Sequence, residues 1–221
     1  MSYILHIDTS TDISTVALGQ DGQLIASSTN EESRNHAATI NHMIENVIRE
    51  GGITLPGIDA VAVCAGPGSY TGLRVGMATA KGLCYALDKP LIADNRLALI
   101  AFTQYEQHKK YDRYIPLIIA RDKEYFTGVY GHSFTEILPA QHIDETKLFE
   151  IVKKNIKTLL ITNAPENAVS EQKSELISVE TDIRFDLSSW VRYSHEQFIC
   201  KNTVNLSTAA PFYLKQVYTH K

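Results

Sequence analysis

The sequence lacks the long apolar runs, the paired cysteines and the basic clusters that mark several classes of protein. No apolar run reaches the roughly 20 residues that a membrane-spanning helix needs. The three cysteines, Cys64, Cys84 and Cys200, form no CxxC pair, and the first two lie in apolar surroundings, where a buried and inert thiol is usual. The 21 lysines and arginines are scattered and the net charge is −4, so we expect no tight, independent binding to nucleic acid.

The N-terminus lacks the features of a targeting signal. It is apolar only from Tyr3 to Ile7, and no basic segment precedes that stretch. We therefore expect a cytoplasmic protein that does not enter a membrane. With 221 residues, 44% of them hydrophobic, the chain has room for one large domain or two small ones.

The first part of the chain has a clear order of predicted elements. Short β-prone runs separated by turn-forming residues predict a β-meander, and helical spacing of apolar residues then alternates with short apolar runs. The predicted strands and helices are residues 3–7, 14–18 and 24–28 (strands), 35–50 (helix, with Ser33 as N-cap), 60–64 (strand), 71–87 (helix) and 91–93 (strand).

The pattern in the second part is weaker but partly repeats the first. It predicts a helix over residues 97–107, strands over 114–120 and 125–130, a helix over 147–154 and a strand over 159–162. This repeat predicts an α/β fold of two ribonuclease H-like halves, 1–95 and a smaller 96–221. Residues 130–205 offer no recognisable chemistry.

A glycine-rich turn, Gly66 to Gly76, leaves a predicted strand and opens a predicted helix. Such a turn directs free N–H groups and the positive end of the helix dipole at whatever lies in front. A phosphate or anion could bind there, or the glycines could merely permit close packing, and the sequence favours neither. The candidate anion site consists of Asp8, Thr9, Ser10, Gly66, Gly68 and Ser69.

Asp8 is the acid of this candidate site. Following the first strand, it could orient a metal–phosphate group, or it could form a local Asx-turn. We favour the Asx-turn, because no second acid is placed beside Asp8.

Known catalytic and nucleotide motifs fail in this segment. A P-loop lacks its lysine, and a Rossmann fingerprint has one residue too many and is interrupted by Pro67. The nucleophile elbow fails because Pro67 and Thr71 flank Ser69. No histidine pair has metal-binding spacing, and we expect structural roles for His6 and His36. We therefore expect no catalytic residue, no metal and no cofactor.

Several segments together resemble the bacterial TsaB (YeaZ) family. The resemblance is strong over residues 3–100 and patchy beyond them. The segments that carry it are Ile7–Thr11, Arg34–Ala37, Gly66–Gly76, Ala78–Gly82, Ala120–Arg121 with Tyr125, and Pro211–Lys215.

The resemblance implies the fold of the actin, hexokinase and heat-shock ATPase superfamily. It also implies a role in making threonylcarbamoyladenosine on tRNA, as a scaffold for a TsaD-type transferase and a TsaE-type ATPase. Such a scaffold would form a homodimer when alone and meet tRNA only through the complex. Arg96 and Ile100 stand where the transferases carry a metal-binding histidine pair, and neither can ligate a metal. Ile119 replaces an aspartate that is common in the family.

The two predicted helices of the first half are the expected interface with a partner or with a second copy. Their apolar residues could instead pack on the chain's own sheet, which would leave Met43, Met77 and Tyr70 for the partner. The alternatives for function are a stand-alone ATPase or kinase and, more weakly, a glycoprotease-type peptidase. The expected interface residues are His36, Ile40, Met43, Ile44, Val47, Tyr70, Leu73, Arg74 and Met77.

Overall fold

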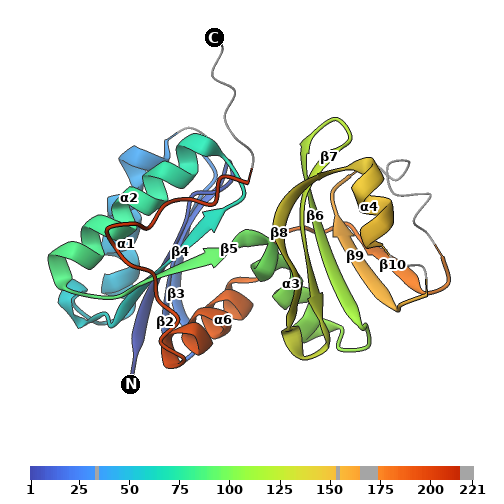
Figure 1. Ribbon diagram of the computed structural model, residues 1–221. Coiled ribbons are helices and arrows are strands. Elements are labelled where there is room, and N and C mark those ends of the chain that lie inside the picture. The colour runs from blue at the N-terminus through green and yellow to red at the C-terminus, as the bar shows by residue number, and fades with distance from the viewer. Residues whose placement is uncertain (33–34, 153–154, 165–173, 215–221) are drawn as a thin grey trace, which may run out of the picture. The chain divides into compact units, whose positions relative to one another are not determined.

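The computed structural model describes residues 1–32, 35–152, 155–164 and 174–214 (Figure 1). The chain divides into two compact units. Unit 1 contains residues 1–96 and 187–212, and unit 2 contains residues 97–186 and those from Tyr213 onward. The chain first passes from unit 1 to unit 2 after residue 96, one residue from the expected boundary after residue 95. The expected second half, 96–221, is wrong in part, because residues 187–212 return to unit 1.

Unit 1 contains one mixed sheet with strand order β3-β2-β1-β4-β5. The meander β1–β2–β3 is antiparallel, whereas β4 and β5 are parallel to β1, which excludes the all-parallel Rossmann arrangement. Asp21 and Gly22 both have positive φ (48° and 79°), which suits the tight hairpin between β2 and β3. The strands are β1 (Tyr3–Asp8), β2 (Ser14–Gln20), β3 (Gln23–Asn30), β4 (Ala60–Gly66) and β5 (Leu91–Asn95).

Helices cover both faces of this sheet. Helices α1 (His36–Glu50) and α2 (Tyr70–Leu87) pack on one face, and α6 (Leu187–Ile199) packs on the other. Alternation along β1 separates the two cores: Leu5 faces α1 and α2, whereas His6 faces α6. A short 3-10 helix, η1 (Leu55–Gly57), leads into β4.

Unit 2 repeats the sheet of unit 1. Its order is β10-β9-β6-β7-β8, with an antiparallel β6–β7–β8 meander and with β9 and β10 parallel to β6. This repeat confirms the predicted fold of two ribonuclease H-like halves. The elements are α3 (Arg96–Gln107), β6 (Arg113–Arg121), β7 (Glu124–Gly131), η2 (His132–Phe134), β8 (Glu136–Asp144), α4 (Glu145–Ile151), β9 (Thr158–Thr162) and β10 (Ile177–Glu180).

The two faces of the unit 2 sheet differ in composition. Aliphatic side chains such as Ile115 pack with Leu148 of α4. Tyr114, the neighbour of Ile115, belongs to the opposite face, where its ring meets that of Tyr105 from α3. One face of unit 2 is therefore aliphatic and the other is rich in aromatic rings.

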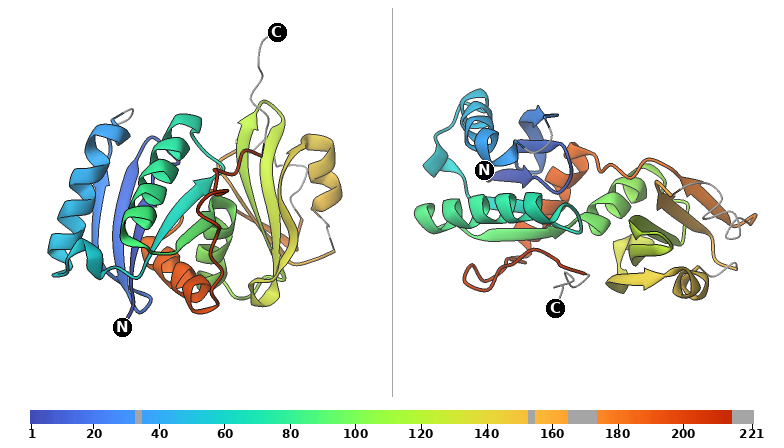
Figure 2. Two further views of the ribbon diagram at one scale, coloured as in Figure 1. Left: turned by 60° about the vertical axis from the view of Figure 1, so that its left-hand side comes forward. Right: turned by 90° about the horizontal axis from the view of Figure 1, so that it is seen from above.

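The segment after α6 runs back across unit 1, and we call residues 203–212 the C-terminal strap (dark red in Figure 2). The Val204 N–H donates to the Leu91 carbonyl (2.9 Å), and the Phe212 N–H donates to the Ala65 carbonyl (2.8 Å). Lys81 of α2 donates from Nζ to the Ala209 carbonyl (2.9 Å). Leu206, Ala209 and Phe212 pack against the main core of unit 1. The strap thus joins α2, β4 and β5.

Candidate functional site

The glycine-rich turn and the turn after β1 lie in direct contact. The Ser69 N–H donates to the Ser10 carbonyl (2.7 Å), and the Thr9 hydroxyl donates to the Gly72 carbonyl (2.7 Å). Ser69 is the N-cap of α2, and its hydroxyl accepts from the Gly72 N–H (3.3 Å). The structure therefore brings the residues of the candidate anion site together. The N–H groups of Ser69 and Gly72, however, already donate to oxygen atoms of the chain itself.

The glycines make room for this contact. A Cβ at Gly68 would overlap the Ser10 carbonyl oxygen, one at Gly72 the Thr9 carbonyl oxygen, and one at Gly76 the Thr9 hydroxyl. The helix start is thus faced by the chain's own backbone. Close packing, the second of the two explanations for the glycines, accounts for all three positions.

Asp8 forms the predicted local turn. Its Oδ1 accepts from the Ser10 N–H (2.8 Å), and its side chain is buried. Cys64 lies below the turn, with Sγ 3.6 Å from the Ser10 hydroxyl. Burial, and after it the charge of Asp8, raises the pKa of Cys64 well above its usual value, although Arg96 acts in the opposite direction. The Cys64 thiol is therefore protonated at neutral pH and is a poor nucleophile.

A second buried polar cluster, on the α6 face, was not predicted from the sequence. Asp94 Oδ2 accepts from the Trp190 indole N–H (2.7 Å) and from the Ser194 hydroxyl (2.7 Å). The edge of the His6 ring meets Trp190, with centroids 5.0 Å apart. The only signal was the acid at the end of β5, and its partners come from residues about a hundred positions later. The cluster fixes α6 on the sheet.

The expected interface residues separate into buried and exposed groups. Six apolar ones face the core of unit 1 and are at most 5% exposed, so the expectation that they meet a partner is corrected. His36 is also buried, and its Nε2 lies 2.9 Å from the Thr11 carbonyl oxygen. Only Tyr70 and Arg74 are exposed. The six core residues are Ile40, Met43, Ile44, Val47, Leu73 and Met77.

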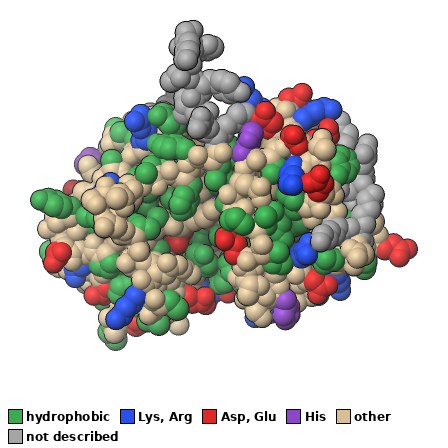
Figure 3. Space-filling view, in the orientation of Figure 1, with side chains coloured by type: hydrophobic (Ala, Val, Ile, Leu, Met, Phe, Trp, Pro, Cys, Tyr) green, Lys and Arg blue, Asp and Glu red, His purple; other side chains and the backbone are tan. Residues whose placement is uncertain are grey.

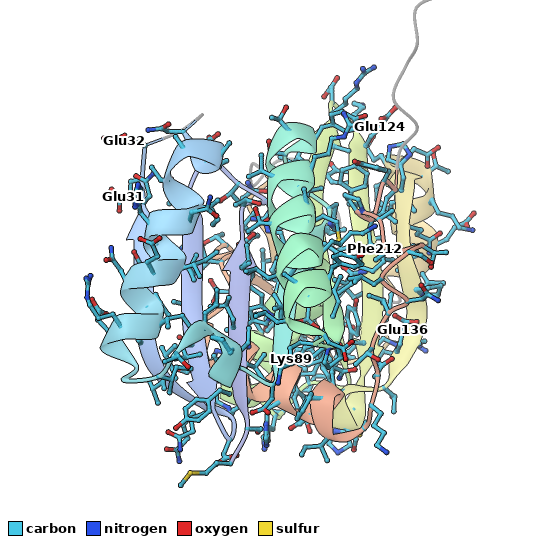
Figure 4. The ribbon with its side chains drawn as sticks, turned by 90° about the vertical axis from the view of Figure 1, so that its left-hand side faces the viewer. Glu31, Glu32, Lys89, Glu124, Glu136 and Phe212 are labelled. Atoms are coloured by element: carbon cyan, nitrogen blue, oxygen red, sulfur yellow. The ribbon has the colours of Figure 1, made fainter. Side chains whose placement is uncertain are left out.

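The exposed side of α2 has a composition of its own, and we call it the α2 outer face. Tyr70 is 43% exposed and Tyr85 84% exposed, and the Arg74 guanidinium lies 4.9 Å from the Tyr70 ring centroid. Between the two tyrosines are Ala78 and Gly82, and a Cβ on Gly82 would meet nothing within 4 Å. Figure 4 shows α1 and α2 side by side in front of the sheet, with Lys89 just beyond the end of α2.

Acidic and basic side chains are both scattered over the face shown in Figure 3. Within the described ranges, no group of three or more His, Cys, Asp or Glu residues could hold a metal ion. None of the described helices is long and apolar enough to cross a membrane.

Comparison with known proteins identifies the family. The sequence model described as "TsaD: tRNA N6-adenosine threonylcarbamoyltransferase" matches residues 23–178. The tRNA threonylcarbamoyladenosine biosynthesis protein TsaB of Haemophilus influenzae is 30% identical over 211 residues, which cover 94% of this chain and 80% of that protein. The chain belongs to the TsaB family.

Two further comparisons place this TsaB family member among its relatives. The tRNA N6-adenosine threonylcarbamoyltransferase of Clostridium perfringens is 34% identical over 121 residues, which cover 54% of this chain but only 32% of the transferase. The matched segment thus spans about a third of the length of that enzyme. The solved structure of YeaZ from Pseudomonas aeruginosa shares the fold, with a TM-score of 0.81, 24% identity, and coverage of 97% of this chain and 100% of that one.

Proposed function

We propose that this chain is a non-catalytic subunit of the system that makes threonylcarbamoyladenosine on tRNA. In this proposal it binds a TsaD-type transferase and a TsaE-type ATPase in the cytoplasm, forms a homodimer when alone, and meets tRNA together with its partners. Membership of the TsaB family supports the pathway. The absence of catalysis is our own inference from the site.

The observation that carries this inference is the contact between the two turns of unit 1. In the chain as folded, the Thr9 and Ser10 carbonyls occupy the space beside Gly68 and Gly72. The nearby thiol of Cys64 is buried, with a raised pKa. These glycines are explained by the contact between the two turns, and two N–H groups of the helix start are bonded within the chain, so we assign this region to structure.

The α2 outer face is our candidate for the docking surface. Tyrosine and arginine are enriched in protein interfaces and among the residues that dominate binding energy, and lysine and glutamate are depleted. The α2 outer face offers Tyr70, Arg74 and Tyr85 around the small residues Ala78 and Gly82, where a partner backbone can approach closely. Together with the exposed side of α1, it can supply the roughly 1,000 Å² of buried area that a stable complex needs.

The test is assembly with a TsaD-type partner after the substitution Ala78→Glu. Ala78 is exposed, so the fold should survive, whereas the buried Met43 is unsuitable as a probe. An unpaired carboxylate enclosed in an interface costs several kcal/mol, so we expect affinity to fall by at least about tenfold. Size-exclusion chromatography and calorimetry of the mixed proteins measure this.

Thr146→Glu, at an exposed position on α4, is the matched control and should assemble normally. Assembly of the Ala78→Glu protein at unchanged affinity would reject the α2 outer face. Failure of the unaltered chain to bind the partner would reject the proposed function. ATP hydrolysis by the isolated chain, abolished by Asp8→Asn, would instead favour the nucleotide-dependent enzyme.

A further inference from the structure

Three tyrosines form a continuous ring cluster at one end of unit 2, beside the start of β6. Tyr114 lies at its centre and is fully buried. Its ring meets the Tyr105 ring at 5.6 Å and 86°, and the Tyr111 ring at 6.1 Å and 84°. The Tyr114 hydroxyl donates to the His108 carbonyl (2.5 Å), which fixes the loop before β6. The cluster is therefore a rigid base.

Three lysine ammonium groups lie over this base. Lys109 Nζ is 5.7 Å from the Tyr105 centroid, and Lys110 Nζ is 5.2 Å from the Tyr111 centroid. Lys157 Nζ, from the segment before β9, is 6.0 Å from the same Tyr111 ring. All three ammonium groups lie within the roughly 6 Å range of a cation–π contact, so the ring cluster gathers three positive charges in one place.

The two segments that supply the lysines are tied together. The Lys157 carbonyl accepts from the N–H groups of Asp112 (2.8 Å) and Arg113 (3.2 Å). Arg113 begins β6, and Lys157 directly precedes the parallel strand β9, so both belong to the same end of the sheet (Figure 1). We call Lys109, Lys110 and Lys157 the cationic patch.

The charge of the cationic patch is opposite to that of the whole chain. Its three lysines stand near the exposed Asp112, whose charge acts on Tyr114 at the centre of the cluster, in a protein whose net charge is −4. In the described residues, none of the three lysines forms an ion pair with a carboxylate. By contrast, Lys123 and Lys147 in the same unit do, with Glu145 and Glu150.

These features match the backbone of a nucleic acid. Clustered lysines neutralise phosphates and release counterions, which gives affinity without reading the base sequence. Tyr111 is only 7% exposed, so its ring holds the lysines and offers no free surface for base stacking. We propose that the cationic patch binds the sugar–phosphate backbone of tRNA, an inference that rests on the proposed function for the identity of the RNA.

The test is binding of a labelled tRNA transcript to the full chain, followed by fluorescence anisotropy between about 50 and 200 mM salt. The variant is Lys109→Gln/Lys110→Gln/Lys157→Gln, which leaves a polar side chain at each position and removes three charges. Each lost phosphate contact lowers the salt slope by about 0.7–0.9, so we expect the slope to fall by about 2 to 3. We expect affinity at about 50 mM salt to fall by on the order of tenfold or more.

The matched control is Lys89→Gln/Lys123→Gln/Lys147→Gln, which removes the same charge elsewhere and should bind tRNA like the unaltered chain. Equal loss in both triple variants would overturn the proposal, since total charge would then explain binding. Unchanged tRNA affinity in the patch variant would also overturn it. The same holds if the patch variant keeps its tRNA affinity but no longer binds the protein partner.

Assembly with the TsaD-type partner, measured in parallel, separates this proposal from the proposed function. A chain that binds tRNA through the cationic patch but never assembles supports the patch and overturns the proposed function. If the chain assembles with the partner but the patch variant keeps full tRNA affinity, the proposed function is supported and the cationic patch is rejected.

Discussion

At the scale of single residues, Asp94 and His6 are two titratable groups enclosed on the α6 face of unit 1 with opposite responses to burial. Burial raises the pKa of Asp94 from 3.8 to about 6, although the Trp190 and Ser194 hydrogen bonds favour the ionised form. Burial lowers the pKa of His6 from 6.5 to about 3, although the backbone of Ile4 and Ala17 acts in the opposite direction. Both groups therefore favour their neutral forms when the chain folds.

These shifts have opposite effects on stability. For Asp94, the folded state binds the proton more tightly, so its contribution is full below pH 3.8 and is lost as pH rises through about 6. For His6, the unfolded state binds the proton more tightly, so stability is lost as pH falls from 6.5 toward about 3. Between about pH 4 and pH 6 the two contributions offset each other.

Asp94→Asn should expose the His6 contribution. We expect this variant to lose stability relative to the unaltered chain as pH falls from about 6 to about 4, by up to about 1.4 kcal/mol per pH unit. Urea unfolding midpoints across that range measure the difference. Asp12→Asn, the same substitution at an exposed aspartate, is the matched control. A pH-independent difference between Asp94→Asn and the unaltered chain would contradict the assignment.

At the scale of elements, α2 carries glycines with opposite surroundings. Gly72 faces the Thr9 carbonyl, whereas Gly82 faces open space. Gly72→Ala should therefore destabilise the chain by about 1–3 kcal/mol, because the turn after β1 must move. Gly82→Ala should stabilise it by about 0.5–1 kcal/mol, as expected for glycine replaced inside a helix. Thermal unfolding of the two variants measures both effects, and a loss at Gly82 equal to that at Gly72 would refute this explanation.

The elements with strong periodicity could be predicted from the sequence, and others could not. Helix α2 was predicted as 71–87 and observed as Tyr70–Leu87. Helix α6 was not predicted. Two of its four buried residues are serines, so its buried face does not show up as a periodic pattern of apolar residues. Strand β8 was missed because most of it is at least partly exposed at a sheet edge.

Parts of the predicted segments cannot be compared. Ser33, Arg34, residues 153–154 of the predicted helix 147–154, and Lys215 lie outside the described residues. Asn35 occupies the N-cap position of α1, without a side-chain bond to the helix.

The candidate site was predicted less well than the fold. The spacing of Ile40, Met43, Ile44 and Val47 reveals that α1 has an apolar face, but not what covers that face. Similarly, Gly68 and Gly72 indicate that another group lies close to the backbone at these positions, but the sequence does not identify that group. Both questions depend on contacts between distant parts of the chain, which local patterns do not contain.

At the scale of the whole molecule, unit 1 is discontinuous in sequence. Helix α6 covers the face formed by Ile4, Ala60, Ala62 and Ile92, and the C-terminal strap bonds to β4 and β5. The first 96 residues therefore contain the sheet but not the cover of one of its faces.

A fragment of residues 1–96 should consequently fail to form a unique native state. Its uncovered apolar face should give dye binding and a broad, non-cooperative unfolding transition. The same fragment joined by a flexible linker to residues 187–212 should unfold cooperatively, as followed by circular dichroism. Cooperative unfolding of the 1–96 fragment alone would show that α6 and the strap are dispensable.

The return of residues 187–212 to unit 1 also sets the order of events during synthesis. The half that leaves the ribosome first cannot close until α6 and the strap have been translated, so the second sheet can assemble while the first is still incomplete. Translation of residues 187–212 is thus the step that completes the part of the protein made first, and termination before it leaves that part without the cover of one face.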